Sequence, residues 1–190
     1  MTKIDERCEK MREIHVDDWE VKPVSLFKRT WGALTSGNER DGWNAMTISW
    51  GSVGTLWGRG DIDRTVPICN VYVRPSRFTH HLMMANDEFT VSFLGENYRK
   101  SLGILGSKSG RDDPEKIKNA GLSVVIEGKT AYLAGSDLVL VCRKIYHQSM
   151  SADHLIDKEL IDYCYKTDIN DFHDLFVGEI LKVLVKDETT

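Results

Sequence analysis

Closely spaced turn signals divide this chain into short segments rich in β-forming residues, and this pattern limits the possible folds more than any other feature. Turn residues gather at 36–38 with 41–42, at 86–87 and at 127–128. Runs rich in Val, Ile, Leu, Phe and Thr lie between them, as is typical of strands. Antiparallel strands with short helices between them predict a mainly β protein, a β-barrel decorated with short α-helices.

The expected elements follow one another along the whole chain. A weak apolar stripe predicts a helix within residues 4–14, and a Gly-rich, charged stretch at 52–64 predicts a long surface loop. We expect strands over 24–35, 44–51, 66–73, 88–94, 122–126, 129–133, 137–147 and 172–185. We expect helices over 76–85, 98–105, 113–121 and parts of 151–165.

Length, charge and hydropathy narrow the class of protein. With 190 residues, of which 41% are hydrophobic, the chain suits one domain over 1–190 that can bury a core. A formal net charge of −4 offers no basic face for nucleic acid. The apolar runs are too short to cross a bilayer, and residues 1–9 are charged throughout. We therefore expect no membrane helix and no signal peptide.

Cysteine usage and one missing motif exclude further classes. The four cysteines are scattered, with no CxxC pair and no histidines at zinc spacing, which argues against a metal site and a disulfide framework. Free thiols in a reducing cytoplasm are expected, so we predict a cytoplasmic protein. No GxGxxG follows a strand, and the chain therefore carries no Rossmann fingerprint for a nicotinamide.

The stretch 44–51 mixes polar and apolar residues on both faces of an expected strand. Asn44, Met46 and Ile48 fall on one side, and Ala45, Thr47 and Ser49 on the other. Hydroxyl and amide groups among apolar atoms suit the wall of a pocket for a flat, partly polar ligand. The same residues also suit an ordinary sheet strand.

Two further segments, 74–79 and 106–112, have the composition of anion-binding turns. Ser76 is expected to head a helix, whose free N–H groups and partial positive charge favour an anion beside Arg77 and Thr79. The second segment supplies hydroxyls, Lys108, Arg111 and glycine for a close backbone approach. The alternatives are plain helix capping for the first segment and a solvated surface loop for the second.

These three segments, in this order, resemble the FMN-binding split-barrel flavoproteins of the flavin reductase-like family, above all its flavoredoxin branch. The resemblance covers about residues 22–185. It implies a mainly β, split β-barrel fold that binds FMN non-covalently. By this resemblance the cofactor-binding residues are Asn44, Ala45, Met46, Thr47, Ser49, Trp50, Ser76, Arg77, Thr79, Ser107, Lys108, Ser109 and Arg111.

Two histidines are secondary candidates for positions near the flavin. His147 ends a long expected strand, where it equally suits an exposed turn. His173 opens a segment that resembles the closing strand of the family, where it reaches the pocket or only caps the strand. Trp50 matches a family aromatic near the flavin and equally suits the core.

The resemblance also implies an activity. We expect an NAD(P)H:flavin oxidoreductase that takes hydride from NAD(P)H and passes electrons to free flavin or to a partner protein, and that assembles as a homodimer. The main alternative is a flavoredoxin-like FMN electron carrier without nicotinamide activity. A third possibility is a barrel that binds a ligand other than flavin.

Overall fold

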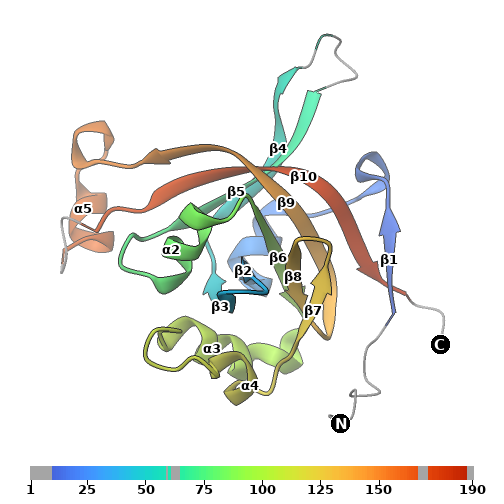
Figure 1. Cartoon of the computed structure of the whole chain (residues 1–190). Coiled ribbons are helices and arrows are strands. Elements are labelled where there is room, and N and C mark those ends of the chain that lie inside the picture. The colour runs from blue at the N-terminus through green and yellow to red at the C-terminus, as the bar shows by residue number, and fades with distance from the viewer. Residues whose placement is uncertain (1–9, 59, 61–64, 167–170, 188–190) are drawn as a thin grey trace.

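The computed structural model describes residues 10–58, 60, 65–166 and 171–187. A strongly curved, eight-stranded antiparallel sheet forms a split β-barrel (Figure 1). Seven strands follow the order β3-β2-β6-β9-β10-β5-β4, and β1 pairs with the C-terminal end of β10. The strands are β1 (Met11–Ile14), β2 (Gly32–Asn38), β3 (Gly42–Ile48), β4 (Gly51–Gly58), β5 (Thr65–Val73), β6 (Glu88–Leu94), β9 (Ser136–Ser149) and β10 (Asp174–Lys186), with a separate hairpin of β7 (Val124–Glu127) and β8 (Thr130–Leu133).

Short helices connect and cover the strands. The α-helices are α1 (Pro23–Ser25), α2 (Phe78–Ala85), α3 (Arg99–Ser107), α4 (Lys116–Asn119) and α5 (Glu159–Cys164). Short 3-10 helices are η1 (Val16–Asp18), η4 (Glu96–Tyr98) and η5 (Ala152–His154), and η2 (Leu26–Thr30) is a π-helix. No helix in the described ranges is both long and apolar enough to span a membrane.

The two long strands β9 and β10 run side by side through the molecule, with α5 beyond one end (Figure 1). Along its first half, Asp174 to Glu179, β10 also pairs with β5. Gly178 permits close packing there, since a Cβ at this position would lie 2.5 Å from the Phe89 ring. The start of β10 is therefore fixed between two strands.

Two apolar clusters hold the barrel and its helices together. The larger cluster fills the barrel with side chains such as Phe27, Phe89, Phe93, Leu140 and Phe176. The second lies between β2–β3 and the helices α3 and α4, and it includes Ala33, Ala45, Leu102, Leu105 and Ile117. Because Ala45 is fully buried in this second cluster, α3 is anchored against β3.

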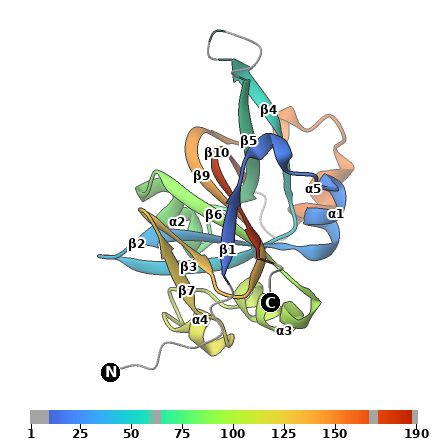
Figure 2. The same ribbon diagram turned by 90° about the vertical axis from the view of Figure 1, so that its right-hand side faces the viewer.

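The pair β4–β5 extends away from the rest of the barrel, as both views show (Figures 1 and 2). We expected a long surface loop over 52–64, and this expectation is wrong for 52–58, which belong to β4. The reason is that β4 is an edge strand with mostly exposed side chains, so its sequence lacks an alternating apolar face. Residues 59 and 61–64 lie outside the described ranges.

Two other expectations near the N-terminus are also wrong. Residues 11–14 form strand β1 instead of the end of a helix, and residues 1–9 lie outside the described ranges. The strand expected over 24–35 begins only at Gly32, because Pro23 starts a helical segment that continues to Thr30. Trp31, with φ 63°, then turns the chain into β2.

The hairpins expected from the turn residues at 36–38 with 41–42 and at 127–128 are confirmed by the pairs β2–β3 and β7–β8. Residues 36–38, however, are the last residues of strand β2, and the first turn itself lies at 39–41. The remaining strands and helices lie within a few residues of their expected positions. Cys69, Cys142 and Cys164 are free thiols, as expected; Cys8 lies outside the described ranges.

Candidate functional site

A cavity of about 130 Å³ lies where β3 ends and the chain turns into β4. Its wall is the second half of the 44–51 stretch. Across from that wall stand side chains from β5, from the turn after it and from the residue before β10. The lining residues are Met46, Thr47, Ile48, Ser49, Trp50, Tyr72, Arg74, Arg77 and His173.

A second cavity, of about 100 Å³, adjoins the first, and the two share Met46 and Arg77. It lies between the start of α2 and the loop after α3. Its lining residues are Met46, Ser76, Arg77, Phe78, Thr79, Leu105, Gly106, Lys108, Ser109, Gly110 and Lys116. Three of these residues, Arg77, Lys108 and Lys116, are cationic. The second cavity is therefore positively charged, and it lies next to the mixed polar and apolar wall of the first cavity.

Arg77 joins the two cavities. It is exposed, and within the described ranges no hydrogen bond or ion pair fixes its guanidinium. It also stands at the N-cap of α2, where the first N–H groups of the helix have no acceptors within the helix. An anion here would meet both a free guanidinium and the positive end of a helix.

Ser76 has a different role from the one expected. The helix begins at Phe78 and not at Ser76, so Ser76 does not cap it. Its hydroxyl and its backbone N–H instead donate to the carboxylate of Asp171, at 2.6 and 3.0 Å. Ser76 lines the second cavity, but its donors are already bonded.

The same Asp171 anchors Arg74. The Arg74 guanidinium donates to the backbone oxygens of Asp171 and Cys164, at 3.2 and 2.5 Å, and lies 4.9 Å from the centre of the Tyr165 ring. These contacts tie the end of α5 and the residues before β10 to the turn after β5. Arg74 is thus a positioning residue of the first cavity.

Three residues pack together beside the second cavity; Thr79 and Gly110 line it, and Asn44 is buried behind them. Asn44 donates to the Thr79 hydroxyl at 2.6 Å, and both side chains are buried. Gly110 packs on this pair so closely that a Cβ there would lie 2.1 Å from the Asn44 amide oxygen. The loop after α3 therefore requires glycine at 110 to reach α2.

Lys116 was not identified from the sequence, although it lines the second cavity. It is 2% exposed, and its ammonium donates to the carbonyl oxygens of Leu105 and Lys108 at 3.4 and 3.0 Å. Burial, and to a lesser extent the Arg77 charge, lower its pKa to about 8, while Asp113 opposes the shift. An anionic group bound in the cavity, in addition to Asp113, would favour the charged form of this lysine.

Lys108 and Ser109 also line the second cavity, as expected. The Lys108 side chain is 54% exposed, with its ammonium 3.5 Å from the Asp113 carboxylate. The Ser109 hydroxyl accepts the backbone N–H of Arg111 at 3.1 Å and so shapes the turn. Thr47, on the wall of the first cavity, donates to the Leu102 carbonyl at 2.5 Å and anchors α3.

His173 borders the first cavity next to Trp50, whose ring centre lies 4.4 Å away. Burial lowers the pKa of His173 to about 4, and the Arg74 charge acts in the same direction. The imidazole is therefore neutral near pH 7. Its Nδ1 lies 2.9 Å from the Tyr165 hydroxyl, whose own pKa is raised by burial. Trp50 is 42% exposed and so does not belong to the core.

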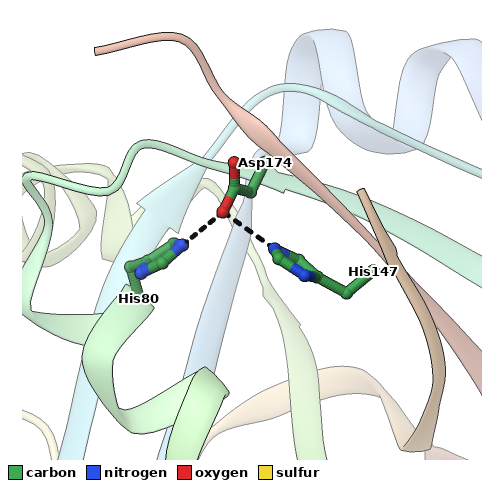
Figure 3. A group of neighbouring side chains, drawn as sticks. All are labelled: His80, His147 and Asp174. Carbon is green, nitrogen blue, oxygen red and sulfur yellow. Dashed lines mark hydrogen bonds and ion pairs between the residues drawn. The ribbon is translucent and has the colours of Figure 1, made fainter. Parts of the chain in front are cut away.

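Five residues named from the sequence do not line either cavity. Asn44 and Ala45 are buried behind the wall, and the Ser107 hydroxyl bonds the Ile104 carbonyl at 3.3 Å. Arg111 lies over the Phe78 ring. His147 is bonded to Asp174 on another part of the molecule (Figure 3). Lys116, Tyr72 and Asp171 carried no recognisable sequence signal, because burial and long-range contacts define them.

A family model described as a flavin reductase-like domain matches residues 25–190. The chain belongs to the flavin reductase-like family. A curated relative of this flavin reductase-like chain, an uncharacterized protein from Aeropyrum pernix, is 28% identical over 124 residues, or 65% of this chain. The chain spans 40% of the length of that relative.

Solved structures of the same fold are similar to this flavin reductase-like chain. An FMN-binding domain of a flavin reductases-like enzyme from Shewanella baltica is 17% identical, with 94% of this chain and 78% of that chain covered and a TM-score of 0.63. Flavoredoxin of Desulfovibrio vulgaris is 19% identical, with 84% and 70% covered and a TM-score of 0.59. An NADH:FAD oxidoreductase from Streptomyces globisporus, in complex with NAD and FAD fragments, is 15% identical, with 81% and 73% covered and a TM-score of 0.56.

The two cavities of this flavin reductase-like chain fit the parts of FMN. The cationic cavity offers Arg77, Lys108 and Lys116 for a phosphate, and the wall from Met46 to Trp50 offers a surface for a ring. Neither cavity is large enough to enclose the whole molecule, because ligand pockets span about 300–1,000 Å³. The ring would thus lie along an open wall.

Proposed function

We propose that this chain binds FMN and is an NAD(P)H-dependent flavin reductase that passes electrons to free flavin or to a partner protein. One observation carries the proposal. The cavity at the end of β3 shares Met46 and Arg77 with a neighbouring cavity that is lined by three cationic side chains. The similarity in fold to an FMN-binding domain and to an NADH:FAD oxidoreductase supports it.

The protein's part is to hold and orient the cofactor. When bound, FMN would supply the redox chemistry, hydride acceptance and electron release, without a side-chain acid or base. Lys108 and Lys116 would bind the phosphate. Arg77, which lines both cavities, would contribute positive charge to the phosphate and also to the ring edge, where negative charge arrives on reduction. Neutral His173 and exposed Trp50 would border the face that admits the nicotinamide.

The proposal is tested by anaerobic mixing of the FMN-loaded protein with NADH and, separately, with NADPH. We expect at least one of them to bleach the visible absorbance of the flavin. Dithionite serves as a control, because it reduces a bound flavin whatever the physiological donor. Bleaching by dithionite alone would exclude the reductase.

A flavoredoxin-like electron carrier is the second candidate. It is favoured by the open wall, since Trp50 and Arg77 are both exposed and a ring between them would be within reach of another protein. The similarity in fold to a flavoredoxin agrees with it. The same anaerobic experiment separates the two candidates.

We also propose a homodimer. Leu56, Trp57 and Tyr146 are 38%, 50% and 40% exposed, and the Trp57 and Tyr146 rings lie 5.9 Å apart near the extended β4–β5 pair. An apolar group of this kind suits burial against a second copy. A monomer by light scattering, with flavin still bound, would contradict this proposal.

A further inference from the structure

Three side chains from separate elements, none of which lines either cavity, converge on one point (Figure 3). His80 comes from the first turn of α2, His147 from the end of β9, and Asp174 from the start of β10. The Nε2 atoms of His80 and His147 lie 2.7 and 2.8 Å from the same atom, Oδ2 of Asp174. The three ligand atoms all lie within 4.8 Å of one another.

The cluster is largely buried and well supported. The side chains of Asp174, His80 and His147 are 6%, 14% and 30% exposed, so His147 is the member of the group most accessible to solvent. The Phe176 ring, fully buried, lies 4.7 Å from the His147 ring and 5.5 Å from the His80 ring. Ser149 of β9 lies directly opposite Asp174 in the pairing of β9 with β10. Such outer contacts fix the orientation of ligand side chains in metal sites.

The cluster is distinct from the proposed flavin site. None of its three side chains lines either cavity in the described ranges. Adjacent residues of an extended chain point to opposite faces, so Asp174 faces this cluster whereas His173 faces the first cavity. The two sites nevertheless share elements, because α2 begins at the second cavity.

We propose that His80, His147 and Asp174 bind a divalent first-row transition metal ion, with Zn²⁺ as the best-suited ion. Two imidazoles and one carboxylate are a common donor set for such ions, with the remaining position open to water. Tetrahedral coordination separates neighbouring ligand atoms by about 3.3 Å. In such a site each imidazole nitrogen would lie about half an ångström farther from Oδ2, and the two nitrogens, which are within 4.8 Å of each other, would also lie about 3.3 Å apart.

A bound ion would connect α2 to β9 and β10. The ion would hold the start of α2 and the start of β10 together beside the flavin site. The sequence contains no metal motif because the closest of these residues along the chain, His147 and Asp174, are 27 positions apart.

The test uses tag-free, full-length protein, treated with EDTA and dialysed, with no flavin added. Titration with Zn²⁺ is expected to show one tight equivalent per chain. His80→Gln, His147→Gln and Asp174→Asn are each expected to weaken binding at least tenfold. The matched control is His81→Gln, because His81 is the exposed neighbour of His80 on α2 and lies outside the cluster. Its affinity should equal that of the unaltered protein.

A second readout requires no variant. Co²⁺ added to the unaltered protein should give the visible absorbance of four-coordinate cobalt, which added Zn²⁺ abolishes. Absence of both a tight Zn²⁺ equivalent and this absorbance would overturn the proposal. So would equal weakening by His81→Gln and His80→Gln. Flavin binding is measured separately, so failure here leaves the proposed function intact, and the reverse also holds.

Discussion

The ammonium of Lys116 lies 3.0 Å from the carbonyl oxygen of Lys108, so a buried cation fixes the loop that presents an exposed one. The first lysine belongs to α4, and the second follows α3. Lys116 therefore contributes positive charge to the second cavity and also positions the loop that carries Lys108.

Replacing Lys116 by methionine should weaken FMN binding by about ten- to a hundredfold, since a charge-assisted bond contributes about 1.5–3 kcal/mol. Riboflavin, which lacks the phosphate, should lose much less affinity. Lys118→Met is the control, because Lys118 lies on the same helix, is exposed and pairs with Glu115. Flavin fluorescence titrations measure both ligands, and equal losses for both would instead assign Lys116 to folding alone.

The lowered pKa of Lys116 predicts that the affinity for FMN depends on pH. Its pKa in the flavin-free protein is lowered to about 8, and a phosphate favours its charged form. Above that pH, FMN binding must therefore take up a proton, and the affinity for FMN should fall. Lys116→Met should remove this fall. A fall of equal size in the variant would point to another group.

Lys108→Ala should weaken FMN binding by about tenfold, the lower end of the range for a charged bond. The effect is expected to be smaller than that of Lys116 because the Lys108 side chain is 54% exposed and shares its charge with Asp113. Riboflavin affinity should not change. Unaltered FMN affinity would mean that the 106–112 turn is merely a solvated loop.

Gly110→Ala should destabilise the protein by about 1–3 kcal/mol, as overpacking does. The added methyl group meets the amide oxygen of buried Asn44. Combining it with Asn44→Ala should relieve part of the clash, so the two changes should be less than additive. Urea denaturation of the two single variants and the double variant measures this coupling. Simple additivity would show that the loop does not pack on Asn44.

The lowered pKa of His173 predicts how the free energy of unfolding changes at acidic pH. Its folded pKa, about 4, lies below its ordinary value of 6.5, so the unfolded chain binds the proton more readily. Stability contributed by the neutral imidazole is therefore complete above about pH 6.5 and is lost as the pH falls toward 4. His173→Gln should show a shallower loss over that window in urea midpoints. Parallel profiles would show that His173 is not buried as described.

Local signals predicted much of the fold. The hairpins signalled at 36–38 with 41–42 and at 127–128 were predictable because glycine, asparagine and aspartate specify turns by their own backbone preferences. Strand β4 was missed because an exposed edge strand has no apolar period. The helical start at Pro23 was missed because the β-formers after it suggested a strand.

The sequence named many of the residues that line the two cavities, but it did not indicate the long-range contacts that position them. Met46, Thr47, Ser49, Trp50, Arg77, Thr79, Lys108 and Ser109 do line the two cavities. The hydrogen bond from Ser76 to Asp171 joins residues 95 positions apart, and the sequence around either residue does not indicate it. The sequence suggests that Lys116 is an ordinary surface lysine, whereas the structure shows that it is buried.

The central claim is that a flavin ring wall and a phosphate site form one continuous pocket. The most direct test is a paired titration of the unaltered protein with FMN and with riboflavin under identical conditions. Three cationic side chains at the phosphate end predict that FMN binds at least about tenfold more tightly. Equal affinity for the two ligands, or no binding of either, would contradict the account.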